Sequence, residues 1–487
     1  MTSTFHGIEL GKRGLSAQQT ALSTTGHNIS NANTIGYTRQ RAEMQATPSI
    51  SNNGVQLGTG VNVNSLVRLR EEYLDTQFRG ENKKLGYYEA KSDTLSKIED
   101  ILNEPSDDGL GHVLDEFWKG WQELSKDPDS SAARAVVRQN GVAVVETFKY
   151  ISDSLEQIKD DLKNIITTKE KEVNSLAKQI SDLNGQISRL VANDYQPNDL
   201  YDQRDVLIDQ LSKLVDVKVT PILNGNDKDT GMVNVSVGGG LLVSGSNPAN
   251  PLKIVIDDVV DVENGITIGG EPISLESGEL LGRIESYGIK DGGSKSTIPS
   301  MMDKINELAR TFAEEVNKVH LSGLNLENIH GELDESGNPL KSVEFFTKIG
   351  TDFTAKDLNV NPDIMVNLNL ISAATKENNG SPDQSSTGNG KNALDMAKIK
   401  SGIGDLYRNI IGHLGIDSQE AQRMLNNTEG IVNQVENRRQ SISGVSLDEE
   451  MANMIKFQQA YNAAARMVTA MDQCLDKVIN GMGRVGL

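Results

Sequence analysis

The chain has 487 residues, a length that accommodates two to four domains. Its formal net charge of −20 argues against nucleic acid as a partner. Cys474 is the only cysteine, which excludes an intramolecular disulfide, and no apolar run approaches the roughly 20 residues that a membrane-spanning helix needs.

The N-terminal region is expected to form a helix over residues 3–30, and it lacks the apolar core of a signal peptide. Export, if it occurs, would therefore use a route without a cleaved signal. Gly11, Gly14 and Gly26 weaken this helix by about 1 kcal/mol each relative to alanine, so we expect it to become ordered only on assembly. Apolar residues recur at every seventh position: Ile8, Leu15, Leu22 and Ile29.

Residues 31–64 are rich in Asn, Gly and Thr, which predicts an irregular or hairpin-forming segment. A helical pattern follows over 66–104 and ends near Pro105. These two segments connect the N-terminal helix to the middle of the chain.

The longest predicted helix begins at Ser130 or Ser131 and runs to about Asn193. At 1.5 Å per residue it would be on the order of 90 Å long, so it needs antiparallel partners. Lys169 occupies a position where the apolar rhythm calls for a core residue, which is typical of a stutter. The candidate partners are the segments 66–104, 300–320 and 392–444.

From about Val215 to Gly293, short alternating runs separated by Gly, Asn, Asp and Pro predict an antiparallel β-domain. Helical periodicity returns over 298–320. Residues 321–390 are mostly loop, with a flexible surface segment at 376–392. A further helical region leads from Ala393 to the C-terminal helix.

The C-terminal helix carries a continuous apolar line with steps of three and four. For one such helix, the simplest interpretation is a core that faces the protein's own domain. The matching N-terminal repeat and the nearly neutral charge of both ends favour packing between subunits instead. The predicted assembly seam on this helix consists of Met454, Phe457, Tyr461, Ala464, Val468, Met471, Leu475 and Val478.

The predicted fold class is multidomain α+β, with terminal coiled-coil helices, a bundle of long helices and an inserted antiparallel β-domain. Residues 1–65 with 445–487 would form the terminal coiled coil. The other predicted units are a helical bundle of 66–214, 298–320 and 391–444, a β-domain of 215–297, and a loop-rich segment, 321–390, packed on the bundle.

No catalytic, cofactor or metal site is expected. None of the six histidines lies in an HExxH pattern or another close ligand pair. An enzyme of another class, such as a surface hydrolase, would need a cluster of carboxylates in the β-domain. The acidic group there is best interpreted as a solvated turn: Asp257, Asp258, Asp261 and Glu263.

Several stretches of the sequence resemble one family. GLSAQQTALSTTGHNISNANTIGYTRQR at 14–41 resembles the N-terminal signature of bacterial flagellar axial proteins, and 446–479 is similar to their C-terminal partner segment. NDLYDQRDVLIDQLSKLVDV at 198–217 is similar to a segment typical of the hook-associated protein 1 family, as are 279–288 and 302–325. Rod and hook proteins lack these internal stretches.

This resemblance implies a ring of identical subunits at the junction between hook and filament, with terminal helices that line the export channel. It implies contacts with the hook protein, with hook-associated protein 3 on the filament side, and with an export chaperone on the C-terminal helix. It places the protein outside the cell, in the flagellum, after type III export. Neither nucleic acid nor a membrane is an expected partner.

The N-terminal signature includes Asn31, Asn33, Gly36 and Tyr37, which are expected to shape the turn that leaves the first helix. A turn without any contact role is the alternative for each of them. The main alternative for the whole protein is a distal rod or hook protein of the same superfamily, and the segment 198–217 argues against it.

Overall fold

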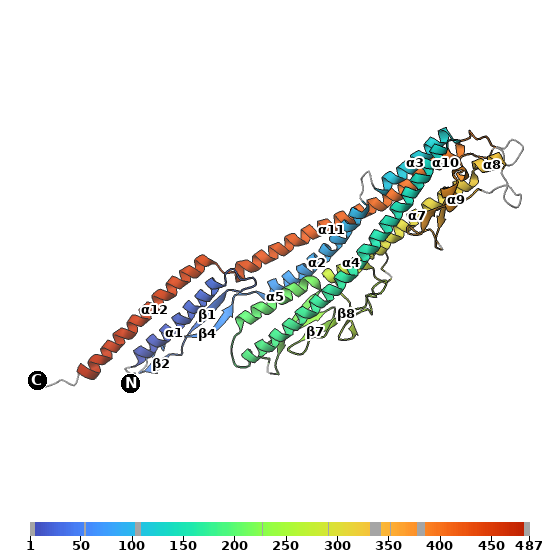
Figure 1. Ribbon diagram of the computed structural model, residues 1–487. Coiled ribbons are helices and arrows are strands. Elements are labelled where there is room, and N and C mark those ends of the chain that lie inside the picture. Colours follow the sequence, from blue (N-terminus) through green and yellow to red (C-terminus); the bar gives the residue numbers. More distant parts are fainter. Residues whose placement is uncertain are drawn as a thin grey trace.

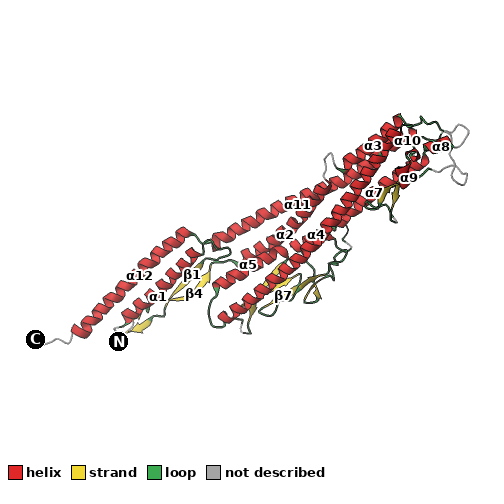
Figure 2. Cartoon of the chain, in the orientation of Figure 1, coloured by secondary structure: helices red, strands yellow, loops and turns green. Residues whose placement is uncertain are grey.

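The computed structural model describes residues 5–52, 55–102, 109–225, 227–290, 292–331, 342–350, 352–376 and 385–481. The molecule is long and narrow, and both ends of the chain lie at the same end of it (Figure 1). We call the part built from 5–52, 55–68 and 447–481 the terminal arm, and the remainder the body. Helices dominate both parts and small antiparallel sheets lie beside them (Figure 2), so the predicted α+β class is confirmed.

The terminal arm combines two helices with a β-hairpin. Its helices are α1 (His6–Ser30) and α12 (Leu447–Asp476), which ends in a π-helical turn at Lys477–Gly481. Strand β1 (Gln40–Ala46) pairs antiparallel with β4 (Val61–Arg68), and the short strands β2 (Ile50–Asn52) and β3 (Val55–Leu57) extend the hairpin. The hairpin expected within 31–64 is therefore present and continues to Arg68.

The body is built around α4 (Ser131–Val191), whose first turn is capped by the Ser130 hydroxyl accepting from the backbone of Ala133. Its 61 residues give a length of roughly 90 Å, as predicted. Other helices of the body are α2 (Glu72–Leu102), α3 (Leu110–Lys126), α5 (Asn198–Leu214), α7 (Thr297–Ser322), α10 (Lys391–Lys398) and α11 (Lys400–Ser443).

The packing of α11 differs from the expectation that 392–444 would pair with the longest helix. Helix α11 packs chiefly along α2, where Ser92 Oγ donates to Gln422 Oε1 at 2.9 Å. The apolar side of α4 is already covered by α3, α5 and α7 and by residues 279–287. Lys169, at the predicted stutter, forms ion pairs with Glu172 at 3.1 Å and with Glu279 at 3.3 Å, so a charge pair replaces the missing core contact.

The stretch predicted as a β-domain, 215–297, contains a helix that the sequence analysis missed. Residues 279–287 form α6 (Glu279–Tyr287), which packs closely on α2 because Gly282 leaves no side chain between the two backbones. Strands β5 (Val217–Leu223), β6 (Asp229–Val237) and β7 (Gly240–Ser244) form one antiparallel sheet. The second sheet has the order β10 (Glu271–Pro272), β9 (Ile266–Ile268), β8 (Leu252–Ile254).

Both sheets lie against the C-terminal half of α4. The Asn184 side chain on α4 donates to the carbonyl oxygens of Val233 and Gly245, each at 2.9 Å, and Asn174 donates to Leu252 O at 2.8 Å. The buried apolar side chains of the sheets join those of the helices in one continuous core. The β region is therefore an elaboration of the helical body.

The far end of the body is closed by part of the segment 321–390. It contains α8 (Leu326–His330), the hairpin of β11 (Phe346–Lys348) and β12 (Leu358–Val360), and α9 (Pro362–Val366). Phe345 and Phe346 are fully buried against aromatic side chains of α3 and α7. Of the predicted flexible loop at 376–392, residues 377–384 lie outside the described residues.

A buried histidine ties this end together. His320 Nδ1 donates to Val343 O at 2.7 Å, and its Nε2 accepts from the backbone N–H of Ser372 at 3.0 Å. Burial lowers the pKa of His320 to about 4, so the ring is neutral at physiological pH and acts as a structural crosslink.

The apolar core stops at the arm. Its buried members extend along the chain from Leu95 to Ala421, and none belongs to the arm. Among the arm residues that the structure describes, Ala17 and Ala21 are the only apolar side chains that are buried. The arm therefore has little hydrophobic stabilisation of its own.

We predict that hydrogen exchange of the isolated protein divides at this boundary. Amides of α1 and α12 should exchange much faster than those of α4 and α7, because local opening of the arm exposes little buried apolar surface. Mass spectrometry of peptic fragments after timed exchange measures this. Equal protection of the arm and of the core helices would contradict the prediction.

Candidate functional site: the terminal arm and its polar root

Helices α1 and α12 pack antiparallel along a line of glycines. A Cβ added to Gly11 would lie 2.6 Å from Val468 Cγ2, and one added to Gly7 would lie 2.8 Å from Met471 Sδ. Gly14 faces Ala464 in the same way, at 3.6 Å. The glycines that the sequence analysis expected only to weaken α1 are thus the positions where α12 approaches its backbone.

The predicted N-terminal seam lies beside this contact line. Ile8, Leu15, Leu22 and Ile29 are all only partly buried. Each of these four residues comes one position after a residue that lies on or near the contact line with α12. Ile8 follows Gly7, and Leu15 follows Gly14. One residue is a rotation of about 100° on an α-helix, so the apolar repeat points to the side of the helix pair. A contact made by a glycine leaves no apolar residue in the sequence pattern. For this reason the seven-residue apolar repeat of α1 was predicted to be the contact surface.

The predicted C-terminal seam does face α1. Met454, Phe457, Tyr461, Ala464, Val468 and Leu475 are partly buried, whereas Met471 and Val478 are 37% and 44% exposed. A second apolar line on α12, with steps of four, was not predicted from the sequence. It comprises Leu447, Met451 and Ile455, which are 48%, 51% and 61% exposed.

The apolar repeat of α1 and the second apolar line of α12 lie on the same side of the arm. The hairpin covers one flank of α1, where Arg13 Nη1 donates to Thr59 O at 3.3 Å, and Ile8 and Leu15 lie on the other flank. On each helix, the apolar line lies one residue after the contact line and is therefore rotated to one side of it. Because α12 runs antiparallel to α1, that side is the same flank of the pair for both helices. We call this surface the arm face: Ile8, Leu15, Leu22, Ile29, Leu447, Met451 and Ile455.

The loop that leaves α1 contains the predicted motif residues. The Asn31 side chain donates to His27 O at 3.1 Å, and the Tyr37 hydroxyl donates to Asn28 Oδ1 at 2.8 Å. Gly36 has a φ of +79°, and a Cβ there would overlap Val206 on α5. Asn31, Gly36 and Tyr37 therefore fix the turn, whereas Asn33 is exposed to solvent.

This loop is anchored to α5 by aspartates at positions 199, 202, 205 and 209, which share one face of that helix. Asp202 accepts from the backbone of Thr38 at 2.9 Å and from Arg68 at 2.8 Å, and Asp199 accepts from Gln40 at 2.8 Å. Burial raises the pKa of Asp202 above its usual value, even though Arg68 and Thr38 oppose this.

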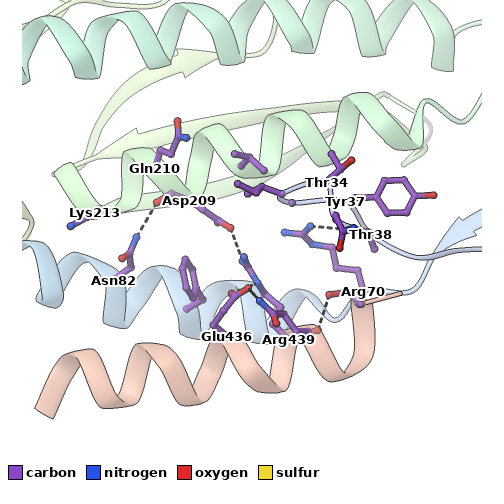
Figure 3. Close-up of a pocket in the computed structure, with 18 of the residues that line it drawn as sticks. Thr34, Tyr37, Thr38, Arg70, Asn82, Asp209, Gln210, Lys213, Glu436 and Arg439 are labelled. Carbon is purple, nitrogen blue, oxygen red and sulfur yellow. Dashed lines mark hydrogen bonds and ion pairs between the residues drawn. The ribbon is translucent and has the colours of Figure 1, made fainter. Parts of the chain in front are cut away.

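Arginines from other segments also reach these aspartates, and Figure 3 shows one of them, Arg439, beside Asp209. Arg79 on α2 contacts Asp209 at 2.7 Å, and Arg439 on α11 contacts Asp209 at 2.6 Å and Asp75 at 3.3 Å. Burial would raise the pKa of Asp205, but Arg70, Arg68 and Arg79 outweigh it and hold that pKa below its usual value. We call this cluster on α5 the arm root.

A second ion-pair group joins α12 to the same place. Arg39 contacts Glu450 at 2.8 Å and Glu449 at 2.7 Å, and the Glu450 side chain is only 3% exposed. Glu450 Oε2 also accepts from Asn28 at 3.1 Å. These residues were not predicted from the sequence. For the arm root itself, the regular spacing of the α5 aspartates was a signal.

The acidic group of the β region forms no site. Asp258 is almost fully exposed and contacts Lys159 at 3.1 Å, and Asp261 accepts from the backbone of Glu263 at 3.0 Å as in a turn. Within the described ranges, no cluster of three or more His, Cys, Asp or Glu side chains could hold a metal. In the same ranges, every helix is too short or too polar to cross a membrane.

We predict that Arg439→Met destabilises the protein by about 3 kcal/mol, because it leaves Asp209 and Asp75 with one cation fewer in a largely buried cluster. Urea denaturation followed by circular dichroism measures the loss. The matched control is Arg408→Met, whose ion pair with Asp405 is exposed and should contribute less than about 1 kcal/mol. Equal effects of the two substitutions would contradict a buried, stabilising root.

Comparison with known families agrees with the division into arm and body. Residues 95–333 match the flagellar hook-associated protein FlgK helical domain. Residues 8–38 match the flagella basal body rod protein family, and 437–481 match the flagellar basal body rod FlgEFG protein C-terminal family. The two matches to rod families therefore lie mainly in the arm, and the match to the hook-associated helical domain lies in the body.

Comparisons over most or all of the chain agree with these family matches. Flagellar hook-associated protein 1 of Escherichia coli K12 is 27% identical, over 96% of this chain and 98% of that protein. The structure of the flagellar hook junction protein FlgK from Burkholderia pseudomallei is similar in fold, with a TM-score of 0.56 at 13% identity, over 77% of this chain and 100% of that one. Flagellar hook-associated protein 1 of Bacillus subtilis strain 168 is 42% identical over 99% of both chains. The chain therefore belongs to the flagellar hook-associated protein 1 family.

Proposed function

We propose that this chain is a structural adaptor that joins the flagellar hook to the filament by assembling into a ring through its terminal arm. The observation that carries the proposal is the arm face, a row of partly exposed apolar side chains on a part of the molecule that lacks a core. Such a surface gains stability when a neighbouring copy covers it.

The arm root supports the mechanical side of this proposal. Ion pairs and hydrogen bonds from α2, α11 and the loop after α1 converge on one face of α5, so the arm is held in one direction relative to the body. A ring that joins two lattices needs subunits with a fixed shape. The long helices of the body would transmit load from the inner contact to the outer surface.

The proposed partners are the hook protein on one side and hook-associated protein 3 on the filament side. The proposed place is the extracellular flagellum, reached through type III export with a chaperone on the C-terminal helix. No catalytic role is proposed. A distal rod or hook role is less well supported, because the body matches the hook-associated helical domain while only the ends match rod families.

Electron microscopy of cells that lack this gene tests the junction role directly. The expected result is hooks without filaments, together with filament protein lost to the medium. Absent hooks would move the role to the rod or hook, and normal filaments would overturn the proposal.

We predict that Ile455→Asp abolishes filament attachment while Ile416→Asp does not. The two isoleucines are 61% and 60% exposed, so neither substitution should destabilise the monomer much. Ile455 lies on the arm face and Ile416 on α11 of the body. Burial of an isoleucine contributes about 1.5–3 kcal/mol, and an aspartate would forfeit this at every copy of the contact.

Swimming assays and counts of attached filaments, together with thermal unfolding of the purified variants, measure these effects. Normal filaments on cells with Ile455→Asp would show that the arm face stays open to water in the assembly.

A further inference from the structure

The hairpin of the arm contains a long stretch without any charge. Residues 44–67 include no Asp, Glu, Lys, Arg or His, although 24% of the chain is charged. Much of this stretch is open to solvent: Met44 and Ile50 are 36% and 57% exposed, and Gln45 and Asn62 are exposed as well. Soluble proteins usually protect exposed strands from one another with charged side chains. A strand surface that lacks them is suited to a lasting contact.

The hairpin also has little support of its own. Among the strands that the structure describes, β1 and β4 pair only with each other, so each has one edge without a partner strand. A two-stranded hairpin is at best marginally stable in water. Both strands pack along α1 (Figure 1), which leaves the other side of the hairpin without an element of the same chain against it. A second surface on that side would stabilise the hairpin.

The hairpin and the arm face lie on opposite flanks of α1. Arg13 donates to the hairpin at Thr59 O, and it comes five residues after Ile8 of the arm face. Five residues are a rotation of about 140° on an α-helix. One copy can therefore offer its arm face to one neighbour and its hairpin to another.

The arm face is as poor in charge as the hairpin. Residues 14–26 of α1 carry no charged side chain, and between 451 and 465 Lys456 is the only charged residue of α12. Lysine can keep its ammonium group in water while its stem covers apolar surface. The two surfaces can therefore come together without burying an unpaired charge, which would be costly.

The two surfaces also match in position along the arm. The hairpin is tied to α1 at Asn28 near one end and at Arg13 near the other. Met44 lies between these two points, level with Leu15 and Leu22 of the arm face. Copies in a ring are related by rotation alone, so Met44 of one copy comes to these leucines of the next.

We propose that the uncharged hairpin of one copy, with Met44 and Ile50, covers the arm face of the next copy. This inference rests on the proposed self-assembly and names the surface that provides the cover. The contact joins two different surfaces, as a ring of more than two copies requires. Pairing of two hairpin edges would instead be symmetric and would stop at a dimer.

A charge placed on the hairpin tests its role. Ile50→Asp should reduce the number of attached filaments about tenfold or more, because burial of an isoleucine strengthens a contact by at least that factor. The matched control is Ile416→Asp, since Ile416 is 60% exposed on α11 of the body and its substitution should leave attachment unchanged. Thermal unfolding of the purified variants verifies that both chains fold. Normal filaments with Ile50→Asp would overturn the inference.

Disulfide cross-linking identifies the occupant. In a chain with Cys474→Ser, the substitutions Met44→Cys and Leu22→Cys lie on opposite flanks of α1, so oxidation can join them only between chains. Assembled flagella should yield a ladder of dimers, trimers and larger species on a non-reducing gel, because each copy uses both surfaces. The control with Ile416→Cys in place of Leu22→Cys should yield no ladder.

A photoreactive probe gives the same information without the double substitution. Benzoylphenylalanine in place of Met44, activated in cells with assembled flagella, should join position 44 to residues 8–29 or 447–455 of another copy. The dilute purified monomer should yield no dimer. A cross-link only to another flagellar protein, or disulfide products that stop at the dimer, would overturn the inference while leaving the ring intact. Cells that lack this chain and still carry normal filaments would instead overturn the proposed function.

Discussion

The acidic face of α5 is the constraint on which the rest of the molecule depends. The chain passes between arm and body at two places, after α1 with its hairpin and before α12, and both are tied to the arm root or beside it. Apart from the half-exposed Asp199, the arginines and aspartates there are largely buried, so each of them needs its partners in place. A cluster of this kind has a narrow set of permitted geometries. It therefore fixes the direction of the arm without an apolar core across the boundary.

This division of labour explains the contrast between the two parts. The body has a continuous apolar core from α2 to α11 and is complete as a single chain. In the arm, glycines let α1 and α12 approach closely, which brings two backbones together but leaves most large apolar side chains at the sides. An arm built in this way is held in place by its root at one end, and the apolar side chains of the arm face remain partly exposed to solvent. Neighbouring copies can supply that cover.

The sequence predicted what depends on regular periodicity. The long helix from Ser130 and the α12 line that faces α1 were predicted because apolar spacing is set directly by helix geometry. The hairpin after α1 was predicted from its content of Asn, Gly and Thr. It misplaced the α1 contact, because glycines at Gly7 and Gly11 leave no apolar signal. It also missed α6 and the arm root. Helix α6 is short and glycine-containing, and the root joins charges more than a hundred residues apart, such as Arg79 and Asp209.

The central claim is that a neighbouring copy covers the arm face in the assembled flagellum. The most direct measurement is a cryo-electron microscopy map of the region between hook and filament, at a resolution that resolves side chains. The account predicts that Leu15, Leu22 and Ile455 of one copy are buried against an adjacent copy, with the arm held to the body as in the isolated chain. A map in which these side chains face open solvent, with copies in contact only through their bodies, would contradict it.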